Sequence, residues 1–332
     1  MGRFSNNEGL WRTVFIVLLG QLISFIMSLS AFSNSFLASL GVDAPITQSF
    51  FTYLSITAVY GSIRLFLRKK LMVSWYYYVP LSFVDVLGNY CVIKAFQFTS
   101  ITSATLFDCW TIPWVMVLTY FFIGSRYSIW QYFGVAICIL GLALALLSDA
   151  GLGGEGGSRP LLGDFLVIVG TLFYALSNVG EEFCVKQKDL VEVISMLGVF
   201  GLLISICEIT LLERHKLLSI EWSSKVMLGF AGHAVAGFLF YTLVPFLLKL
   251  SGSTLFNLSA LTSDMWAVLI RILFYHEQVG WLYYVSFATV ALGLVTYSLS
   301  EEESTEMSNV DGHLKDQYRV LTEESGRETA SV

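Results

Sequence analysis

The sequence predicts an all-α membrane protein with ten transmembrane helices, arranged as two inverted five-helix repeats. Three observations predict this fold: the composition, a series of long apolar stretches, and an internal repeat. Of the 332 residues, 55% are hydrophobic and 13% are charged, and the mean hydropathy is +0.70. A soluble domain carries about 25% charged residues, which cover its surface. A chain with so few charges cannot stay in water.

Ten stretches of the chain are long enough to cross a bilayer, because a helix needs about 20 mostly apolar residues to span the hydrocarbon core. They cover about residues 11–35, 46–66, 75–97, 101–123, 129–148, 161–184, 190–212, 225–248, 253–274 and 280–299. Backbone polar groups in lipid must all be satisfied, so stretches of this length cross as helices rather than as barrel strands.

Two parts of the chain, residues 99–148 and 251–300, align with each other without a gap at a shift of 152 positions. The shift pairs identical residues: Thr102 with Thr254, Trp114 with Trp266, Gly141 with Gly293, and Ser148 with Ser300. Each part holds two apolar spans around a polar hinge, at residues 124–126 and 276–278. Matched hydropathy, span length and hinge position are typical of an internally duplicated membrane transporter.

The loops and the repeat define the expected organisation. A Gly-rich linker at 149–160 separates a first five-helix unit, 11–148, from a second, 161–299. With a cytosolic N-terminus, ten lysines and arginines lie on the cytosolic side and four on the opposite side, although the cluster around Arg214 opposes this orientation. We therefore expect both termini in the cytosol. An odd number of spans in each unit makes the repeats inverted.

The last part of the chain, 300–332, is polar and acidic. From Glu301 onward the chain has nine acidic residues and three basic ones, and this difference accounts for the whole net charge of −6. The rest of the chain is neutral overall, so it offers no basic surface for nucleic acid. This segment buries too little apolar surface to fold, so we expect a disordered cytosolic tail. Tyr318–Leu321 has the form of a sorting signal for an adaptor, with a plain solvated tail as the alternative.

Composition also argues against catalysis and cofactors. The five cysteines lie in or at the ends of apolar spans without a CxxC pair, which indicates core residues rather than a disulfide framework or metal site. The four histidines are scattered, and HExxH, GxSxG and Walker A sequences are absent. We therefore expect no enzyme, no cofactor and no ATP-driven transport by this chain alone.

The run Asn89–Val115, NYCVIKAFQFTSITSATLFDCWTIPWV, resembles the F branch of solute carrier family 35. Together with ten spans in a five-plus-five inversion, it makes residues 11–300 similar to EamA-like members of the drug/metabolite transporter superfamily. Neither hinge keeps the whole Gly-Glu-Arg-like pattern of that superfamily. The resemblance implies a secondary carrier with a central cavity, whose relatives carry nucleotide sugars or other nucleotide-like solutes.

Polar residues inside the spans of the first unit are candidates for the transport site, because a charge at the bilayer centre costs about 3 kcal/mol. Asp85 and Asn89 stand one helical turn apart, and Lys94 lies further along on another face. Asp108, followed by Trp110, lies toward the same membrane side as Lys94, so the two charges are expected to pair. The pair is either a substrate contact that opens during transport or a permanent structural bridge.

The second unit carries a matching set. Tyr174, Asn178 and Glu181 share one face of a helix, and Glu181 with its neighbour Glu182 also fits an interfacial cluster with nearby lysines. Asp264 is at mid-membrane by residue count, where it either serves the substrate or bonds a neighbouring helix. Glycines near His233, and those in the fifth and tenth spans, indicate helix packing.

These observations favour a secondary-active transporter working by alternating access. The residues expected to bind the substrate are Asn89, Lys94, Asp108, Trp110, Tyr174, Asn178, Tyr241 and Asp264. Aromatic surface with one lysine suits a nucleoside- or nucleotide-like solute better than a full nucleotide sugar. The alternative is a polytopic receptor or assembly partner without transport. Expected partners are a small-molecule solute, the lipid bilayer and, for protein, a second copy of the chain. Plasma membrane, vacuole and Golgi all remain open.

Overall fold

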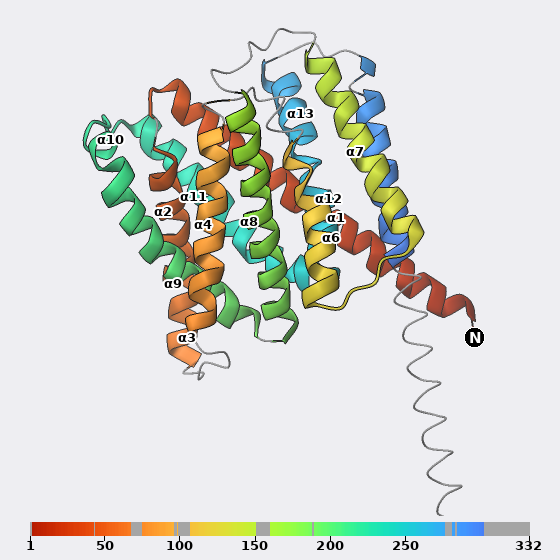
Figure 1. The fold of residues 1–332 in the computed structure, drawn as a ribbon. Coiled ribbons are helices and arrows are strands. Elements are labelled where there is room, and N and C mark those ends of the chain that lie inside the picture. Colours follow the sequence, from red (N-terminus) through yellow and green to blue (C-terminus); the bar gives the residue numbers. More distant parts are fainter. Residues whose placement is uncertain are drawn as a thin grey trace, which may run out of the picture.

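The computed structural model describes residues 2–42, 44–67, 75–95, 98, 107–150, 160–187, 189–275, 281–282 and 284–301. Within these residues the elements are helices without strands (Figure 1), which confirms the all-α prediction. Five helices of the described part are long and apolar enough to cross a membrane: Trp11–Ser39, Pro45–Leu67, Leu161–Gln187, Leu190–Leu218 and Ser224–Leu250. Thr111–Phe122 and Ile129–Leu144 are shorter apolar helices. These helices make the protein a multi-pass membrane protein, while the number ten stays a prediction.

A tight turn joins the first two long helices. Helix α1 spans Gly2–Ser39, and α2 (Pro45–Ile56) continues through the π-helix η1 (Thr57–Gly61) into α3 (Ser62–Leu67). Gly41 makes the turn with a φ of 79°, a backbone conformation that glycine adopts without steric cost. Pro45 then begins α2, where its missing N–H leaves no hydrogen bond unmade.

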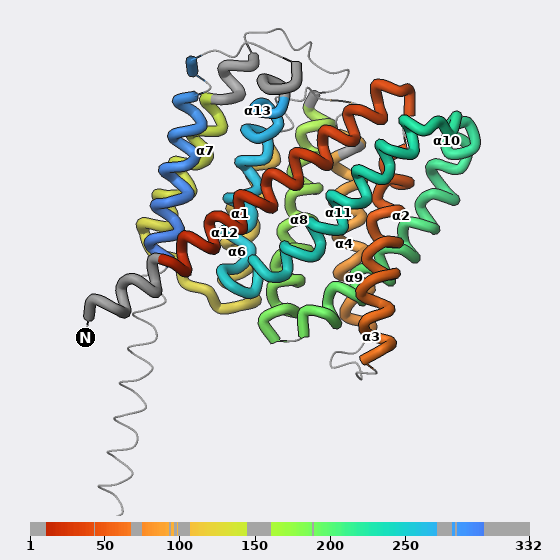
Figure 2. The backbone as a smooth tube through the Cα atoms, turned by 180° about the vertical axis from the view of Figure 1, so that it is seen from behind, coloured from red at the N-terminus to blue at the C-terminus, as the bar shows by residue number. Residues whose placement is uncertain are grey.

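The remaining helical elements follow in chain order. They are η2 (Trp75–Tyr77), α4 (Tyr78–Ala95), α6 (Thr111–Phe122), α7 (Ile129–Ala150), α8 (Pro160–Gln187), α9 (Leu190–Glu208), η3 (Ile209–Glu213), α10 (Arg214–Leu218), α11 (Ser224–Leu250), α12 (Ser253–Ala260) and α13 (Ser263–Tyr275). The last described helix covers residues 284–301. Helix α4 packs against both α8 and α9, and α1 lies beside α11 across the back of the molecule (Figure 2).

Irregular turns occur at matching places in the two halves. The fourth span breaks at residues 109–110 and the ninth at residues 261–262, a separation of 152 positions. The π-helices η1 and η3, at 57–61 and 209–213, are also 152 positions apart. These breaks explain why the fourth and ninth spans do not appear as single long helices.

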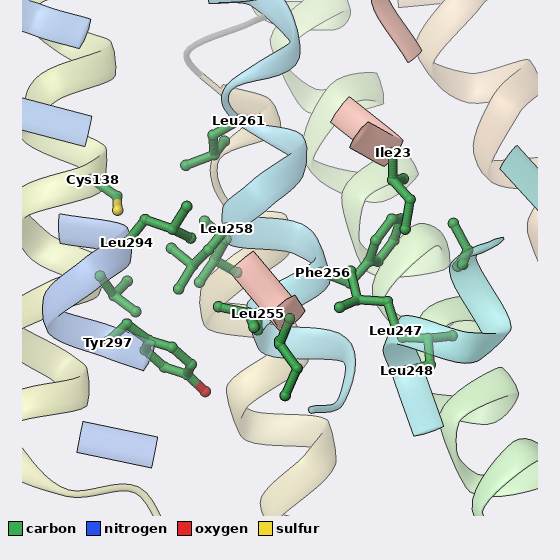
Figure 3. Close-up of a cluster of buried hydrophobic side chains, with 14 of the residues drawn as sticks. Ile23, Cys138, Leu247, Leu248, Leu255, Phe256, Leu258, Leu261, Leu294 and Tyr297 are labelled. Carbon is green, nitrogen blue, oxygen red and sulfur yellow. The ribbon is translucent and has the colours of Figure 1, made fainter. Parts of the chain in front are cut away.

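The largest buried apolar cluster surrounds α12 (Figure 3). Leu255 and Leu258 are fully buried there, with Leu294 and Tyr297 of the last described helix on one side and Leu247 of α11 on the other. Helix α12 is therefore held between elements from the end of the chain and from α11. Its position at the centre of the bundle brings its polar residues close to α8.

Candidate functional site

Asp85 on α4 is the centre of a hydrogen-bond network that joins four helices. Tyr53 of α2 and Tyr241 of α11 donate to its Oδ2 atom, at 2.9 and 3.0 Å. Ser177 of α8 donates to Oδ1 at 3.1 Å. The two tyrosine hydroxyls also lie 2.8 Å from each other. The sequence predicts Asp85 as a polar intramembrane residue, and the structure makes it the hub of the site.

A second set of bonds extends this network along α4 and α8. The Tyr174 hydroxyl donates to Oδ1 of Asn89 at 2.8 Å, and Nδ2 of Asn89 donates to the Asp85 carbonyl at 3.1 Å. Asn178 points elsewhere, because its Nδ2 donates to Oδ1 of Asn257 on α12 at 3.1 Å. Of the predicted residues, Asn89, Tyr174 and Tyr241 are thus brought together around Asp85.

Two glycines make room for the tyrosines of this network. A Cβ atom at Gly88 would lie 3.0 Å from the Tyr174 ring, and one at Gly201 would lie 2.6 Å from the Tyr53 ring. Real Cβ atoms essentially never come as close as the second distance, so a larger residue at 201 displaces Tyr53. The glycines therefore position the two hydroxyls as much as the tyrosines' own helices do.

A cavity of about 300 Å³ reaches this network from the α10 end of the bundle. Tyr53, Asn89 and Lys94 line it within the helices, and Pro45 and Lys216 line it at the helix ends. The remaining lining residues are Ile46, Ser49, Val86, Tyr90, Ser205, Glu208, Leu212 and Glu213. The cavity therefore combines apolar walls with hydroxyl, amide and charged groups, as small-molecule sites do.

The expected ion pair between Lys94 and Asp108 is not formed among the described residues. Instead, the Lys94 ammonium lies 6.0 Å from the centroid of the Phe98 ring, at the outer limit of a cation–π contact. Asp108 directly precedes the break in the fourth span, where its carbonyl accepts a hydrogen bond from the Thr111 hydroxyl at 2.7 Å. Lys94 is left facing the cavity.

Asp264 and Trp110 lie at the two helix breaks, away from the Asp85 network. Asp264 is exposed in the first turn of α13, rather than in the middle of one continuous helix, because the ninth span breaks before it. It lies close enough to Asp108 for the two charges to interact. Trp110 is 49% exposed, and its ring centroid is 6.5 Å from that of Trp114.

Four functional candidates were absent from the residues expected to bind the substrate: Asp85, Tyr53, Ser177 and Asn257. Ser177 stands three residues after Tyr174, so helical spacing alone places it on the same face. Tyr53 carries no such signal, because hydroxyls of tyrosines are common in apolar spans and only packing shows which one meets a carboxylate. The sequence does mark the centre of this network, because Asp85 is a carboxyl inside a predicted span.

The neighbouring acids Glu181 and Glu182 have different environments. Glu182 forms the predicted ion pair with Lys186 at 2.5 Å, and it accepts hydrogen bonds from the backbone N–H and hydroxyl of Ser253. Glu181 points into the bundle with 6% exposure, and its Oε1 has no hydrogen-bond partner among the described residues. The expected interfacial cluster therefore includes Glu182 but not Glu181.

Comparisons with known proteins identify the family. The family model SLC35F, described as solute carrier family 35, matches residues 10–299. Solute carrier family 35 member F2 of Mus musculus is 32% identical over 305 residues, covering 89% of this chain and 81% of the relative. An uncharacterized solute carrier family 35 member of Schizosaccharomyces pombe is 33% identical over 298 residues, covering 88% of this chain and 59% of the relative.

A solved crystal structure shares the fold. It superimposes with a TM-score of 0.70 at 17% identity, over 86% of this chain and 98% of the other. At this identity the likeness concerns the fold alone. The family match covers nearly all of the described helices, and the relatives are solute carriers. The chain therefore belongs to the SLC35F family of solute carrier family 35.

Proposed function

We propose that the protein is a secondary-active transporter that works by alternating access and carries a nucleoside- or nucleotide-like solute. One observation carries the proposal: a cavity leads from one end of the bundle to a polar network built by both halves of the chain. Asp85 and Tyr53 come from the first half, and Ser177 and Tyr241 from the second. Relative motion of the halves would therefore rebuild the site, as alternating access requires.

The spacing of irregular turns supports two inverted repeats, 11–148 and 161–299, joined by the linker at 149–160. Both the π-helices and the helix breaks recur after 152 positions. Such turns are costly within a helix and often mark functional sites, so their recurrence is a stronger indication of duplication than matching apolar residues. Broken helices in equivalent positions of two repeats are also the usual surroundings of a transporter's substrate site.

The cavity lining favours a planar solute of low charge. Lys94 and Lys216 supply two positive groups, Glu208 and Glu213 supply two carboxyls, and Tyr53 and Tyr90 supply aromatic surface beside the Asn89 amide. An amide offers both a donor and an acceptor to a base edge, and a lining with equal numbers of acidic and basic groups suits a solute of low charge. A nucleoside or a monophosphate fits this set better than a diphosphate sugar. Asp108, Trp110, Asn178 and Asp264 would act in conformations that bring the helix breaks to the cavity.

The proposed orientation places both termini in the cytosol, so the cavity in this structure faces the opposite side. Arg12 and Leu250 are joined by a hydrogen bond at 3.5 Å, and Ser251 bonds Glu301 at 2.6 Å, which places the three segments at one end of the bundle. A second copy of the chain and a sorting adaptor at Tyr318–Leu321 are proposed partners. The adaptor site lies outside the described residues.

Thermal unfolding of the purified protein with uridine, uridine monophosphate and a uridine diphosphate sugar tests the substrate class. A ligand that binds only the folded protein raises its Tm by mass action. We expect uridine or the monophosphate to raise the Tm. Asn89→Ala should abolish the rise for both compounds, and Lys94→Ala should abolish it for the monophosphate. Trp130→Ala, at an exposed position outside the cavity, is the control. Saturable flux of the same compound into proteoliposomes separates a transporter from a receptor, which would bind without moving it.

A further inference from the structure

Three oxygen atoms form a closed triangle at the centre of the site. They are Oδ2 of Asp85 and the hydroxyls of Tyr53 and Tyr241, and the three sides measure 2.9, 3.0 and 2.8 Å. Each side has the length of an O–H···O hydrogen bond. Ser177 bonds the other carboxyl oxygen, so it adds no proton to the triangle.

The number of protons in this triangle depends on the state of Asp85. A hydroxyl has one proton to donate. With Asp85 ionised, the two tyrosines supply two protons for three contacts, and one side of the triangle brings two oxygens together without a proton between them. A proton on Oδ2 supplies the third donor. Oδ2 then donates to one tyrosine, that tyrosine donates to the other, and the second tyrosine donates to Oδ2, so all three contacts become hydrogen bonds. The observed geometry therefore fits a neutral Asp85 carboxyl.

Among the described residues, no cationic side chain forms an ion pair with the Asp85 carboxyl. Its partners are tyrosines on α2 and α11 and Ser177 on α8, and Tyr174 and Glu181 face the same region from α8. Glu192 of α9 is directed at Tyr78, near the other end of α4. The nearest lysine on its own helix, Lys94, is nine residues away, about 13 Å along the axis. Glu208, Glu213 and Lys216 line the far part of the cavity.

Glu181 gives an independent indication of proton chemistry. It is 94% buried, and one of its oxygens has no hydrogen-bond partner among the described residues. Burying an ionised carboxylate without a partner is very costly, so such groups usually take up a proton. Glu181 stands one turn after Ser177, about 6 Å further along α8 away from the cavity. The two carboxyls thus follow one another from the cavity floor toward the end that holds the termini.

We infer that Asp85 is a proton-binding site that couples solute movement to the proton gradient, with Glu181 as the next proton acceptor. The inference deepens the proposed transport function and rests on it. A solute in the cavity contacts Tyr53, whose hydroxyl bonds the Asp85 carboxyl, and so opens the triangle. Glu181 first releases its proton toward the end of the bundle that holds Arg12 and Glu301. The Asp85 proton then passes to the Glu181 carboxylate, which leaves Asp85 ionised and Glu181 neutral again. The coupled species is a proton.

Infrared difference spectroscopy of the full chain in detergent tests the proton site without any solute. We expect a carboxylic-acid C=O component that disappears as the pH is raised and that Asp85→Asn removes, while the components of Glu181 and Glu301 remain. Glu221→Gln, at an exposed position outside the cavity, is the matched control and keeps the band. Tyr53→Phe retains the carboxyl and removes one donor, so it should shift the transition to higher pH. An unchanged band in a folded Asp85→Asn protein, or no band in the wild type, overturns the inference.

Coupling is measured with uridine in proteoliposomes that contain a pH-sensitive dye. The wild-type protein should change the lumen pH as uridine moves, whereas Asp85→Asn should exchange uridine without a pH change. Uridine flux at constant lumen pH in the wild type would refute coupling and leave the transport proposal intact. If the wild type moves no uridine, the proposed substrate class loses its support, while the infrared result decides the proton site on its own.

Discussion

The thiol of Cys138 donates to the backbone carbonyl of Val290 at 3.5 Å, and these two residues are 152 positions apart, the spacing of the internal repeat. The contact belongs to a seam between α7 and the last described helix. A Cβ atom at Gly141 would meet Val290, and one at Gly293 would meet Cys138. Under the repeat, Gly141 corresponds to Gly293 and Cys138 to Val290. Each contact therefore occurs twice with the roles exchanged, as a two-fold axis between these helices would produce.

The first prediction concerns this seam. A Cβ atom at Gly134 would lie 2.9 Å from the Gly293 carbonyl oxygen, and one at Gly293 would lie 2.8 Å from the Gly134 carbonyl oxygen. Backbone atoms cannot move aside as a flexible side chain does, so Gly134→Ala and Gly293→Ala should each lower the free energy of unfolding by about 1–3 kcal/mol. Gly61→Ala, whose nearest contact is 3.8 Å away, is the control. Equal Tm values for all three variants in detergent would contradict the seam.

The second prediction concerns coupling between the two tyrosines at Asp85. Tyr53 and Tyr241 share one acceptor and contact each other, so removing both hydroxyls should cost a different amount from the sum of the single losses. We expect an interaction energy of about 0.5–3 kcal/mol in a cycle of Tyr53→Phe and Tyr241→Phe, measured by reversible unfolding. Tyr127 bonds Thr254 instead of Asp85. In a second cycle, the losses of stability caused by Tyr53→Phe and Tyr127→Phe should therefore add. Additivity in both cycles would exclude a shared network.

The third prediction concerns the carboxylate of Glu213, which caps the N-terminus of α2. Its two oxygens accept from the backbone N–H groups of Ile46 and Thr47, each at 2.9 Å. A glutamine side chain has one acceptor oxygen and places an NH₂ group against the other N–H donor. Glu213→Gln should therefore destabilise the protein by about 1–3 kcal/mol. Glu221→Gln, at an exposed position, should change the Tm little, and a similar result for Glu213→Gln would refute the cap.

The fourth prediction concerns pH and Glu301, which follows the last predicted span. Burial raises the pKa of the Glu301 carboxyl from 4.5 to about 7, although the Ser251 hydroxyl partly opposes the shift by bonding the carboxylate. Between these values the folded protein holds more protons at this carboxyl than the unfolded chain does, so the stability that Glu301 contributes is fully present below about 4.5 and is lost as the pH rises to about 7. Glu301→Gln should flatten the dependence of Tm on pH, while Glu221→Gln should preserve it. An unchanged pH dependence in Glu301→Gln would contradict this assignment.

Much of the architecture is determined by the sequence alone. Long apolar stretches can satisfy their backbone in lipid only as helices, and the aligned parts at 99–148 and 251–300 show the spacing at which the structure repeats its breaks and π-turns. The free-energy cost of placing a polar group inside the bilayer likewise singles out Asp85, Asn89 and Tyr174, because polar groups in a span require partners. These predictions depend on local properties that each stretch carries by itself.

Which polar groups meet was decided by the tertiary structure. Residue count places Asp264 at mid-membrane, yet a helix break puts it at an exposed end, and Lys94 approaches Phe98 rather than Asp108. Conversely, Tyr53 becomes a partner of Asp85 only because α2 packs against α9 through Gly201. Hydrogen bonds form over about 3 Å, whereas periodicity locates a side chain only to one face of a helix. The relative height and rotation of packed helices, set by contacts between distant residues, determine the rest.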